Sequence, residues 1–269
     1  MIKLIMGKRV FLFFAIVLVN LSLSANQKPD SLQVLFIGNS YTYYHEMYNM
    51  VREIAAHVGQ DQKIAISPTV FAPGGCTLKR HLQNGELVKA IERGNWDYVI
   101  LQEQSTAPAG PTRVVAENTY LDAARLDSIV KRYNPDAKVI FYMTWGHKYG
   151  TLHRIKNYPI IDTYEGMQHR LATSYLEMAY ENDAWCAPVG LAWMRVRKER
   201  PYTTLYWPDG SHPSKAGSYL AANVIYTTIV QCPYQSSYFA GLDAELAEYL
   251  QQVAQQTVLD NLQLLNIAR

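Results

Sequence analysis

Short apolar runs alternate with longer amphipathic stretches from residue 32 onward. The apolar runs have the length of buried strands and cover residues 32–37, 63–71, 98–102, 138–143 and 184–189. Stretches with helical spacing of apolar positions cover residues 44–57, 78–93, 114–132, 163–180, 213–230 and 243–265. Strands that alternate with helices predict right-handed βαβ units. We therefore expect an α/β fold whose parallel sheet of about five strands is covered by helices on both faces.

Several glycine and polar residues stand at the carboxyl ends of the predicted strands. Ser40 lies on the turn after the first strand, Gly74 and Gly75 follow the second, and Gln102 ends the third. The carboxyl ends of parallel strands share one edge of the sheet, and ligands of open α/β sheets bind beyond that edge. These residues are therefore expected to meet at one active site.

Residues 1–25 have the pattern of a signal peptide. Lys3, Lys8 and Arg9 precede an apolar run over residues 10–19, and small residues follow at 22–25. A membrane-spanning helix needs about 20 apolar residues, so this run is short for one. We expect cleavage, export to the periplasm or the medium, and no stable membrane insertion afterwards. An uncleaved N-terminal anchor is the alternative.

The composition of residues 26–269 restricts the class of function. Residues 1–25 hold three cations and no acid, so the 25 Lys and Arg and 23 Asp and Glu of the whole chain become 22 and 23. This balance argues against a nucleic-acid partner, which would need a basic domain. No linker rich in Pro, Gly or Ser divides residues 26–269, and we expect a single domain.

Cysteines and histidines show no metal-binding pattern. The three cysteines allow at most one disulfide and are typical of buried thiols. Four of the histidines have no ligand-like spacing with carboxylates and are expected at the surface or in a pocket wall. We expect no metal and no cofactor. The residues concerned are Cys76, Cys186, Cys232, His81, His147, His153 and His169.

Two short motifs carry the candidate chemistry. Ser40 closes a Gly-Asn-Ser turn after a buried strand, where its hydroxyl would need a base to become a nucleophile. Asp209 and His212 stand three residues apart on a turn before a helix, so the carboxylate can accept the imidazole Nδ1–H and leave Nε2 facing a serine. Each motif taken alone is common, the first in turns and the second at the N-termini of helices. Together they indicate a Ser-His-Asp triad.

The pair of motifs resembles the SGNH (GDSL-like) hydrolases over about residues 34–222, and residues 209–221 are especially similar to the last block of that family. The resemblance implies a three-layer α/β/α, flavodoxin-like fold and hydrolysis of acyl esters by Ser40, His212 and Asp209. Asn39 replaces the Asp that is usual in the first block and keeps the turn. The α/β-hydrolase alternative requires Gly-x-Ser-x-Gly, and Thr42 stands where the second Gly belongs.

The same resemblance implies an oxyanion hole. Its backbone donors would be the N–H groups of Ser40 and Gly75, with Gly74 as the alternative to Gly75. The family commonly has Gly-x-Asn-Asp in its third block, where the Asn amide donates. This chain has Gln102-Glu103-Gln104 there, so either glutamine could supply the amide. The position at the strand end favours Gln102.

The substrate follows less directly from the sequence. Trp145 comes after the fourth predicted strand, so it is expected either to wall the substrate pocket or to pack in the core. Export, the 20 tyrosines and similarity to Gln-bearing carbohydrate esterases favour a short acyl group, above all acetyl, on a small-molecule or polysaccharide ester. A lipase-like or thioesterase-like enzyme is one alternative. A glycan-binding module that kept the fold without turnover is another.

Overall fold

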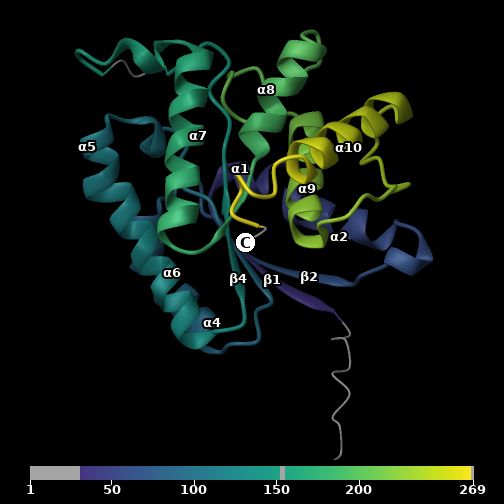
Figure 1. The fold of residues 1–269 in the computed structure, drawn as a ribbon, viewed down its shortest axis with the longest axis horizontal. Coiled ribbons are helices and arrows are strands. Elements are labelled where there is room, and N and C mark those ends of the chain that lie inside the picture. Colours follow the sequence, from purple (N-terminus) through teal and green to yellow (C-terminus); the bar gives the residue numbers. More distant parts are fainter. Residues whose placement is uncertain (1–30, 152–154, 268–269) are drawn as a thin grey trace, which may run out of the picture.

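The computed structural model describes residues 31–151 and 155–267 (Figure 1). The expected signal peptide and His153 lie outside the described residues. The strands are β1 Leu32–Ile37, β2 Ile66–Phe71, β3 Tyr98–Leu101, β4 Lys138–Tyr142 and β5 Trp185–Ala187. The α-helices are α1 Ser40–Tyr43, α2 Met47–Ala56, α3 Leu78–Leu82, α4 Gly85–Glu92, α5 Thr112–Val114, α6 Leu121–Tyr133, α7 Tyr164–Glu181, α8 Val189–Glu199, α9 Lys215–Val230 and α10 Ala244–Leu259. Short 3₁₀ turns cover Tyr44–Glu46, Gln60–Gln62, Ala107–Ala109 and Pro159–Asp162, and a π turn covers Val115–Tyr120.

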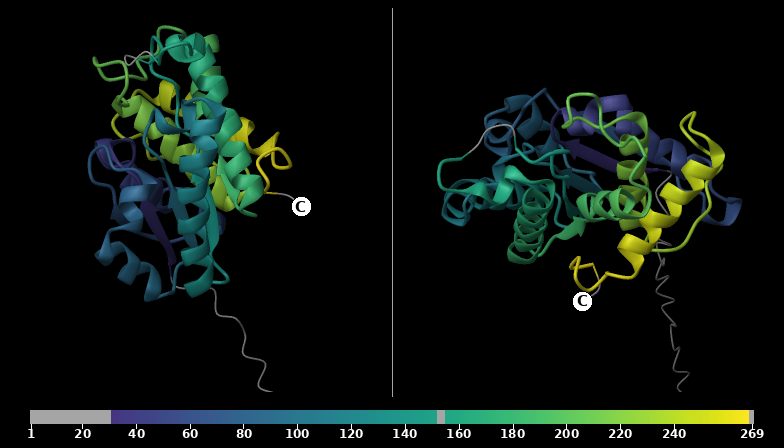
Figure 2. Two further views of the ribbon diagram at one scale, coloured as in Figure 1. Left: turned by 90° about the vertical axis from the view of Figure 1, so that its left-hand side faces the viewer. Right: turned by 90° about the horizontal axis from the view of Figure 1, so that it is seen from above.

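The five strands form one sheet in the order β2-β1-β3-β4-β5, and every neighbouring pair is parallel. Helices α4, α6 and α7 lie on one side of this sheet, and α2, α9 and α10 lie on the other (Figure 1). The view from above in Figure 2 shows the same layering. This strand order is that of flavodoxin-like doubly wound sheets. The expected three-layer α/β/α fold is therefore confirmed.

Helix α9 is the most deeply buried helix of the described chain. Its residues from Ala216 to Ile229 are all buried, because the helix packs against α2, α8 and α10 and also meets β5. A helix that is apolar all round is typical of such a position. The loop that precedes α9 is therefore attached to a rigid part of the core. This loop carries Asp209 and His212.

Two of the helix boundaries that differ from the expectation are explained by local capping. The expected helix over residues 78–93 is two helices, because the Asn84 side chain accepts the N–H groups of Glu86 and Leu87 and starts α4. Helix α9 begins at Lys215 rather than at residue 213, because the Ser214 hydroxyl accepts the Gly217 N–H at 3.1 Å.

Helix α8 was not predicted at all. The run over residues 184–189 was interpreted as one strand, but β5 ends at Ala187 and α8 begins at Val189. The buried residues of α8 are Val189, Gly190, Ala192, Trp193 and Val196, and the intervals of three and four residues among them are a helical signal.

The three cysteines are free thiols, and Cys76 and Cys186 are buried while Cys232 is half-buried. This agrees with the interpretation of these residues as packed thiols. Within the described ranges, no helix combines the length and the apolar character that a membrane crossing requires.

Candidate active site

Ser40 is the first residue of α1, directly beyond the carboxyl end of β1. The Asn39 side chain caps α1 by accepting the Tyr41 N–H at 3.2 Å, and its amide donates to the Cys76 carbonyl at 3.0 Å. Position 38 requires glycine, because a Cβ there would come within 2.6 Å of both the Thr42 and Gln102 side chains. The first N–H groups of a helix have no partner within it. The Ser40 N–H therefore has no partner within α1 and is available to a ligand.

Asp209 and His212 form one tightly bonded turn. One oxygen of the Asp209 carboxylate accepts the backbone N–H groups of Ser211 and His212, both at 2.9 Å. The other oxygen lies 2.5 Å from Nδ1 of the His212 ring. Partial burial acts to raise the pKa of Asp209, but these three hydrogen bonds outweigh it and hold the pKa below its usual value. The carboxylate therefore stays ionised and fixes the imidazole with Nε2 pointing away from it.

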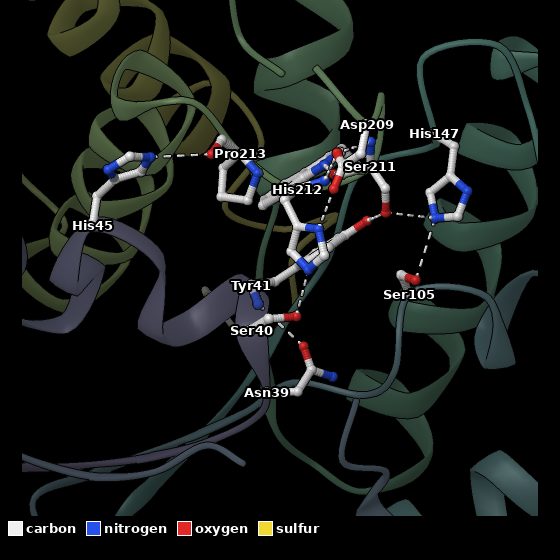
Figure 3. Close-up of polar contacts among 11 residues, drawn as sticks. Asn39, Ser40, Tyr41, His45, Ser105, His147, Asp209, Ser211, His212 and Pro213 are labelled. Carbon is white, nitrogen blue, oxygen red and sulfur yellow. Dashed lines mark hydrogen bonds and ion pairs between the residues drawn. The ribbon is translucent and has the colours of Figure 1, made fainter. Parts of the chain in front are cut away.

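The fold brings this turn to the serine. His212 Nε2 lies 2.9 Å from Ser40 Oγ, although the two residues are 172 positions apart (Figure 3). Ser40, His212 and Asp209 thus form a continuous series of hydrogen bonds. The Tyr44 ring stacks on the His212 ring at 4.5 Å between centroids and restricts its rotation. The three residues singled out from the sequence are in the geometry of a nucleophile, a base and an orienting carboxylate.

A cavity of about 370 Å³ opens beside Ser40 Oγ. Its lining residues are mostly polar, and none of them is Leu, Ile, Val, Met or Phe. They are Asn39, Ser40, Tyr41, Gly75, Gln104, Ser105, Thr106, His147, Asp209, Ser211 and His212. The cavity can therefore hold a small ligand, and its lining offers no large aliphatic side chain along which a long hydrocarbon chain could lie.

Gly75 lines the cavity, whereas Gly74 does not. Gly75 has φ +61°, a left-handed conformation that glycine adopts without strain. Its loop is attached to the nucleophile turn at two points. Asn39 donates to the Cys76 carbonyl, and His81 on α3 lies with Nε2 2.7 Å from the Gly38 carbonyl. Burial lowers the pKa of His81, so the ring is neutral and donates this hydrogen bond.

The two candidate glutamines have different surroundings. Gln102 is fully buried, its Oε1 accepts the Asn39 N–H at 2.9 Å and the Thr42 hydroxyl at 3.0 Å, and its Nε2 donates to the Glu103 carbonyl. Gln102 therefore supports the nucleophile turn from below and does not line the cavity. The structure favours Gln104 over the expected Gln102, because Gln102 is buried beneath this turn and does not line the cavity.

Gln104 lines the cavity with Ser40 and Gly75. Its Oε1 accepts the N–H groups of Thr106 and Ala107, and its Nε2 donates to the Ser105 hydroxyl at 3.3 Å. An amide nitrogen has two hydrogens, so one remains for a ligand. No spacing in the sequence distinguishes the two glutamines, since either can be aligned with the Asn of Gly-x-Asn-Asp.

Glu103 connects the loops that carry Gly75 and Gln104. It is 3% exposed, and its carboxylate accepts the N–H of Leu78, the first residue of α3, at 3.2 and 3.3 Å and that of Gln104 at 2.5 Å. Burial raises the pKa of Glu103 to about 7, with a smaller contribution from Asp122, while the two N–H groups act to lower it. No pattern in the sequence indicates a role for Glu103, because burial of a single Glu leaves no periodicity.

Trp145 is fully buried and does not line the cavity. It stacks between Tyr41, at 4.4 Å, and Trp193, at 3.9 Å, and its Nε1 donates to the Ser211 carbonyl at 3.0 Å. Of the two expectations for Trp145, the structure therefore supports packing: the ring holds the cavity wall from behind. No period or spacing in the sequence could distinguish these roles.

A second polar network lines the cavity beyond the triad. The Tyr41 hydroxyl lies 2.7 Å from the Ser211 hydroxyl, which lies 3.1 Å from His147 Nε2. The same nitrogen lies 3.3 Å from the Ser105 hydroxyl (Figure 3). Burial raises the pKa of Tyr41, so its hydroxyl remains protonated. His147 lines the cavity, in agreement with the expectation of a surface or pocket-wall position. The described residues contain no group of three side chains placed to hold a metal ion.

A serine, an imidazole and a carboxylate in hydrogen-bonded series, at the carboxyl edge of a parallel sheet, form the arrangement that serine hydrolases use. Comparison with solved structures indicates which family of serine hydrolases the fold resembles. The chain is 28% identical to a protein from Slackia heliotrinireducens assigned to the SGNH hydrolases, over 74% of this chain and 99% of that one, with a TM-score of 0.58. The chain belongs to the SGNH hydrolase superfamily.

More distant structures share the fold. A DUF4886 family protein from Bacteroides uniformis is 20% identical with a TM-score of 0.64, covering 85% of this chain and 95% of its own. An acetyl xylan esterase is 13% identical with a TM-score of 0.55, covering 74% of this chain and 100% of its own. No family model and no curated protein sequence matches the chain significantly.

Proposed function

We propose that this protein is a serine esterase in which Ser40 is the nucleophile, His212 the general base and Asp209 the residue that orients the base. The hydrogen-bonded series from Ser40 Oγ through the His212 ring to Asp209 carries this proposal. Ser40 also lines a cavity that can hold an ester, and the Ser40 and Gly75 N–H groups and the Gln104 amide border the same space.

The reaction has two halves, acylation of Ser40 and hydrolysis of the acyl-enzyme, and these groups act in both. His212 Nε2 takes the Ser40 proton while Oγ attacks the ester carbonyl carbon, and the resulting oxyanion accepts hydrogen bonds from Ser40, Gly75 and Gln104. His212 then gives the proton to the leaving alcohol as the C–O bond breaks, which leaves an acyl group on Ser40. Water attacks this acyl-enzyme with His212 as base, and the acid is released with Ser40 restored.

The cavity supports a short acyl group, with acetyl as the first choice. A long acyl chain gains binding energy from apolar side chains at roughly 0.8 kcal/mol per buried CH₂ group, and the lining residues offer none of the large aliphatic ones. The polar walls suit an alcohol with further hydroxyl groups, such as a carbohydrate. A similar fold is found in an acetyl xylan esterase. A lipase-like or thioesterase-like enzyme would need an apolar slot beside Ser40.

Hydrolysis of p-nitrophenyl acetate, butyrate and octanoate tests this proposal. We expect kcat/KM to fall as the acyl chain lengthens. Ser40→Ala should lose nearly all activity, and Asp209→Asn should lose about 10⁴-fold in kcat because the tautomer of the imidazole is no longer fixed. Full activity of Ser40→Ala would refute the triad, and binding of acetylated glycans without turnover would favour a binding module.

A further inference from the structure

Four rings border the triad on its solvent side: Tyr43, Tyr44, His45 and Trp207. We call them the aromatic rim. Tyr43 is 42% exposed and Trp207 is 49% exposed, whereas Tyr44 and His45 are half-buried. Single exposed aromatic side chains are common, but a contiguous row of them beside a cavity often marks a binding site.

The rim is continuous. Tyr43 stacks on Tyr44 at 5.5 Å between centroids, Tyr44 meets His45 edge-on at 6.0 Å, and His45 lies 6.3 Å from Trp207. At one end, the Tyr43 hydroxyl stands over Gly74, 3.7 Å from the place that a Cβ would take. At the other end, Trp207 belongs to the turn of Asp209 and His212, and the backbone N–H of Trp207 donates to the His212 carbonyl.

The backbone holds the rim in place. His45 and Glu46 both have a left-handed conformation, with φ 53° and 52°, which is uncommon for residues other than glycine. This double turn directs His45 toward the triad loop, where its Nε2 lies 3.2 Å from the Pro213 carbonyl (Figure 3). Strained conformations of this kind tend to persist at ligand sites. The rim is therefore set before any ligand arrives.

The chemistry of the triad decides which part of the substrate meets the rim. His212 must give its proton to the leaving alcohol oxygen, so the alcohol part lies on the His212 side of the cavity. The Tyr44 ring stacks directly on His212. Whatever extends from the leaving oxygen toward solvent therefore passes over Tyr44 and its neighbours in the rim.

We propose that the aromatic rim is a subsite for sugar rings of the alcohol part, and that the substrate is an O-acylated polysaccharide or oligosaccharide. This inference rests on the proposed esterase function. A pyranose ring presents a flat C–H face that packs on an aromatic ring and keeps its hydroxyl groups in water. Half-exposed rings in a row suit such a chain, which lies along the surface while one acyl group enters the cavity.

The test compares a polymeric with a small ester. The ratio of kcat/KM on O-acetylated xylan, or on O-acetylated mannan, to that on p-nitrophenyl acetate should fall about tenfold in Tyr43→Ala and in Trp207→Ala, because each removes one ring contact. The loss should appear in KM for the polymer. Tyr202→Ala is the matched control, because Tyr202 is 98% exposed and is not part of the rim.

An unchanged ratio in both variants would overturn the proposal, and so would a wild-type enzyme that hydrolyses p-nitrophenyl acetate but neither polymer. Both results leave the esterase function intact, because loss of p-nitrophenyl acetate hydrolysis in Ser40→Ala establishes that function independently. If Ser40→Ala keeps its activity, the proposed function fails first.

Discussion

Gln102 and Gln104 show how two identical side chains, two positions apart, can serve different purposes. Gln102 satisfies the buried Asn39 N–H and so shapes the turn on which Ser40 stands. Gln104 has its oxygen fixed by the turn that follows and lines the cavity with its amide. The distinction depends on which backbone groups need a partner, and therefore on the fold.

At Gln104 we expect a loss of transition-state stabilisation. Gln104→Ala should lower kcat by about 10²–10³ with little change in KM, as the loss of one oxyanion donor usually does. Gln104→Glu is the matched variant, because it keeps the oxygen that organises the turn and removes the amide donor. Steady-state kinetics on p-nitrophenyl acetate measure both. Near-normal kcat in the two variants would mean that only backbone groups hold the oxyanion.

At Gln102 we expect a loss of stability. Gln102→Ala leaves the buried Asn39 N–H without its acceptor, which should lower the free energy of unfolding by about 1–3 kcal/mol. Chemical denaturation of this variant beside Gln104→Ala checks the difference. If Gln102→Ala proves as stable as the wild type but loses kcat, the two glutamines have the opposite roles.

Among the elements, the end of β3 and the start of α3 depend on each other through one buried carboxyl group. Glu103 follows β3 and accepts the N–H of Leu78 on α3 together with that of Gln104. The loops that hold Gly75 and Gln104 are therefore positioned relative to each other by this side chain. Its burial favours the protonated form, although its two N–H partners favour the ionised one.

This conflict predicts a pH-dependent stability. The pKa of Glu103 is raised from 4.5 to about 7, so the folded state holds a proton that the unfolded state has lost between these values. The contribution of Glu103 is therefore complete below pH 4.5 and declines as the pH rises to about 7. The decline is on the order of 3 kcal/mol, at about 1.36 kcal/mol per pKa unit.

Denaturation of Glu103→Gln from pH 4 to pH 8 checks this, because the decline should be absent from the variant. Glu86→Gln, on the exposed surface of α4, is the control and should follow the wild type. Parallel stability curves for Glu103→Gln and the wild type would show that the pKa of Glu103 is not raised.

The strands could be predicted from the sequence more accurately than the helices. The run over residues 32–37 gives β1 with its observed bounds, because a buried central strand is apolar over its whole length. The helix boundaries depend on caps such as Asn84 and Ser214, which look like any other polar residue in a sequence. The hydrogen bond between Asp209 and His212 could be expected from the sequence, because the two residues stand only three positions apart. The polar network of Tyr41, Ser211 and His147 could not, since only the fold brings these residues together.

For the whole molecule, we expect a mature protein that begins near Asn26. Residues 1–25 carry a basic start, an apolar run and small residues before this point, and β1 begins at Leu32. Mass spectrometry of the protein from the native cell, with the culture fractionated, measures the N-terminus. An intact Met1 in the cytoplasmic fraction would contradict export, and an intact Met1 in the membrane fraction would indicate an anchor.

If the proposed mechanism holds, the separation of Ser40, as nucleophile, from His212, as base, has a consequence for the synthesis of the chain. The nucleophile leaves the ribosome 172 residues before its base, and α9, which anchors the base, is made later still. Synthesis proceeds from the N-terminus, so a nascent chain carries an inert hydroxyl for most of its translation. Chains cut short by a stalled ribosome or a protease before residue 212 are inert for the same reason. Catalytic competence is a property that this chain acquires only near its completion.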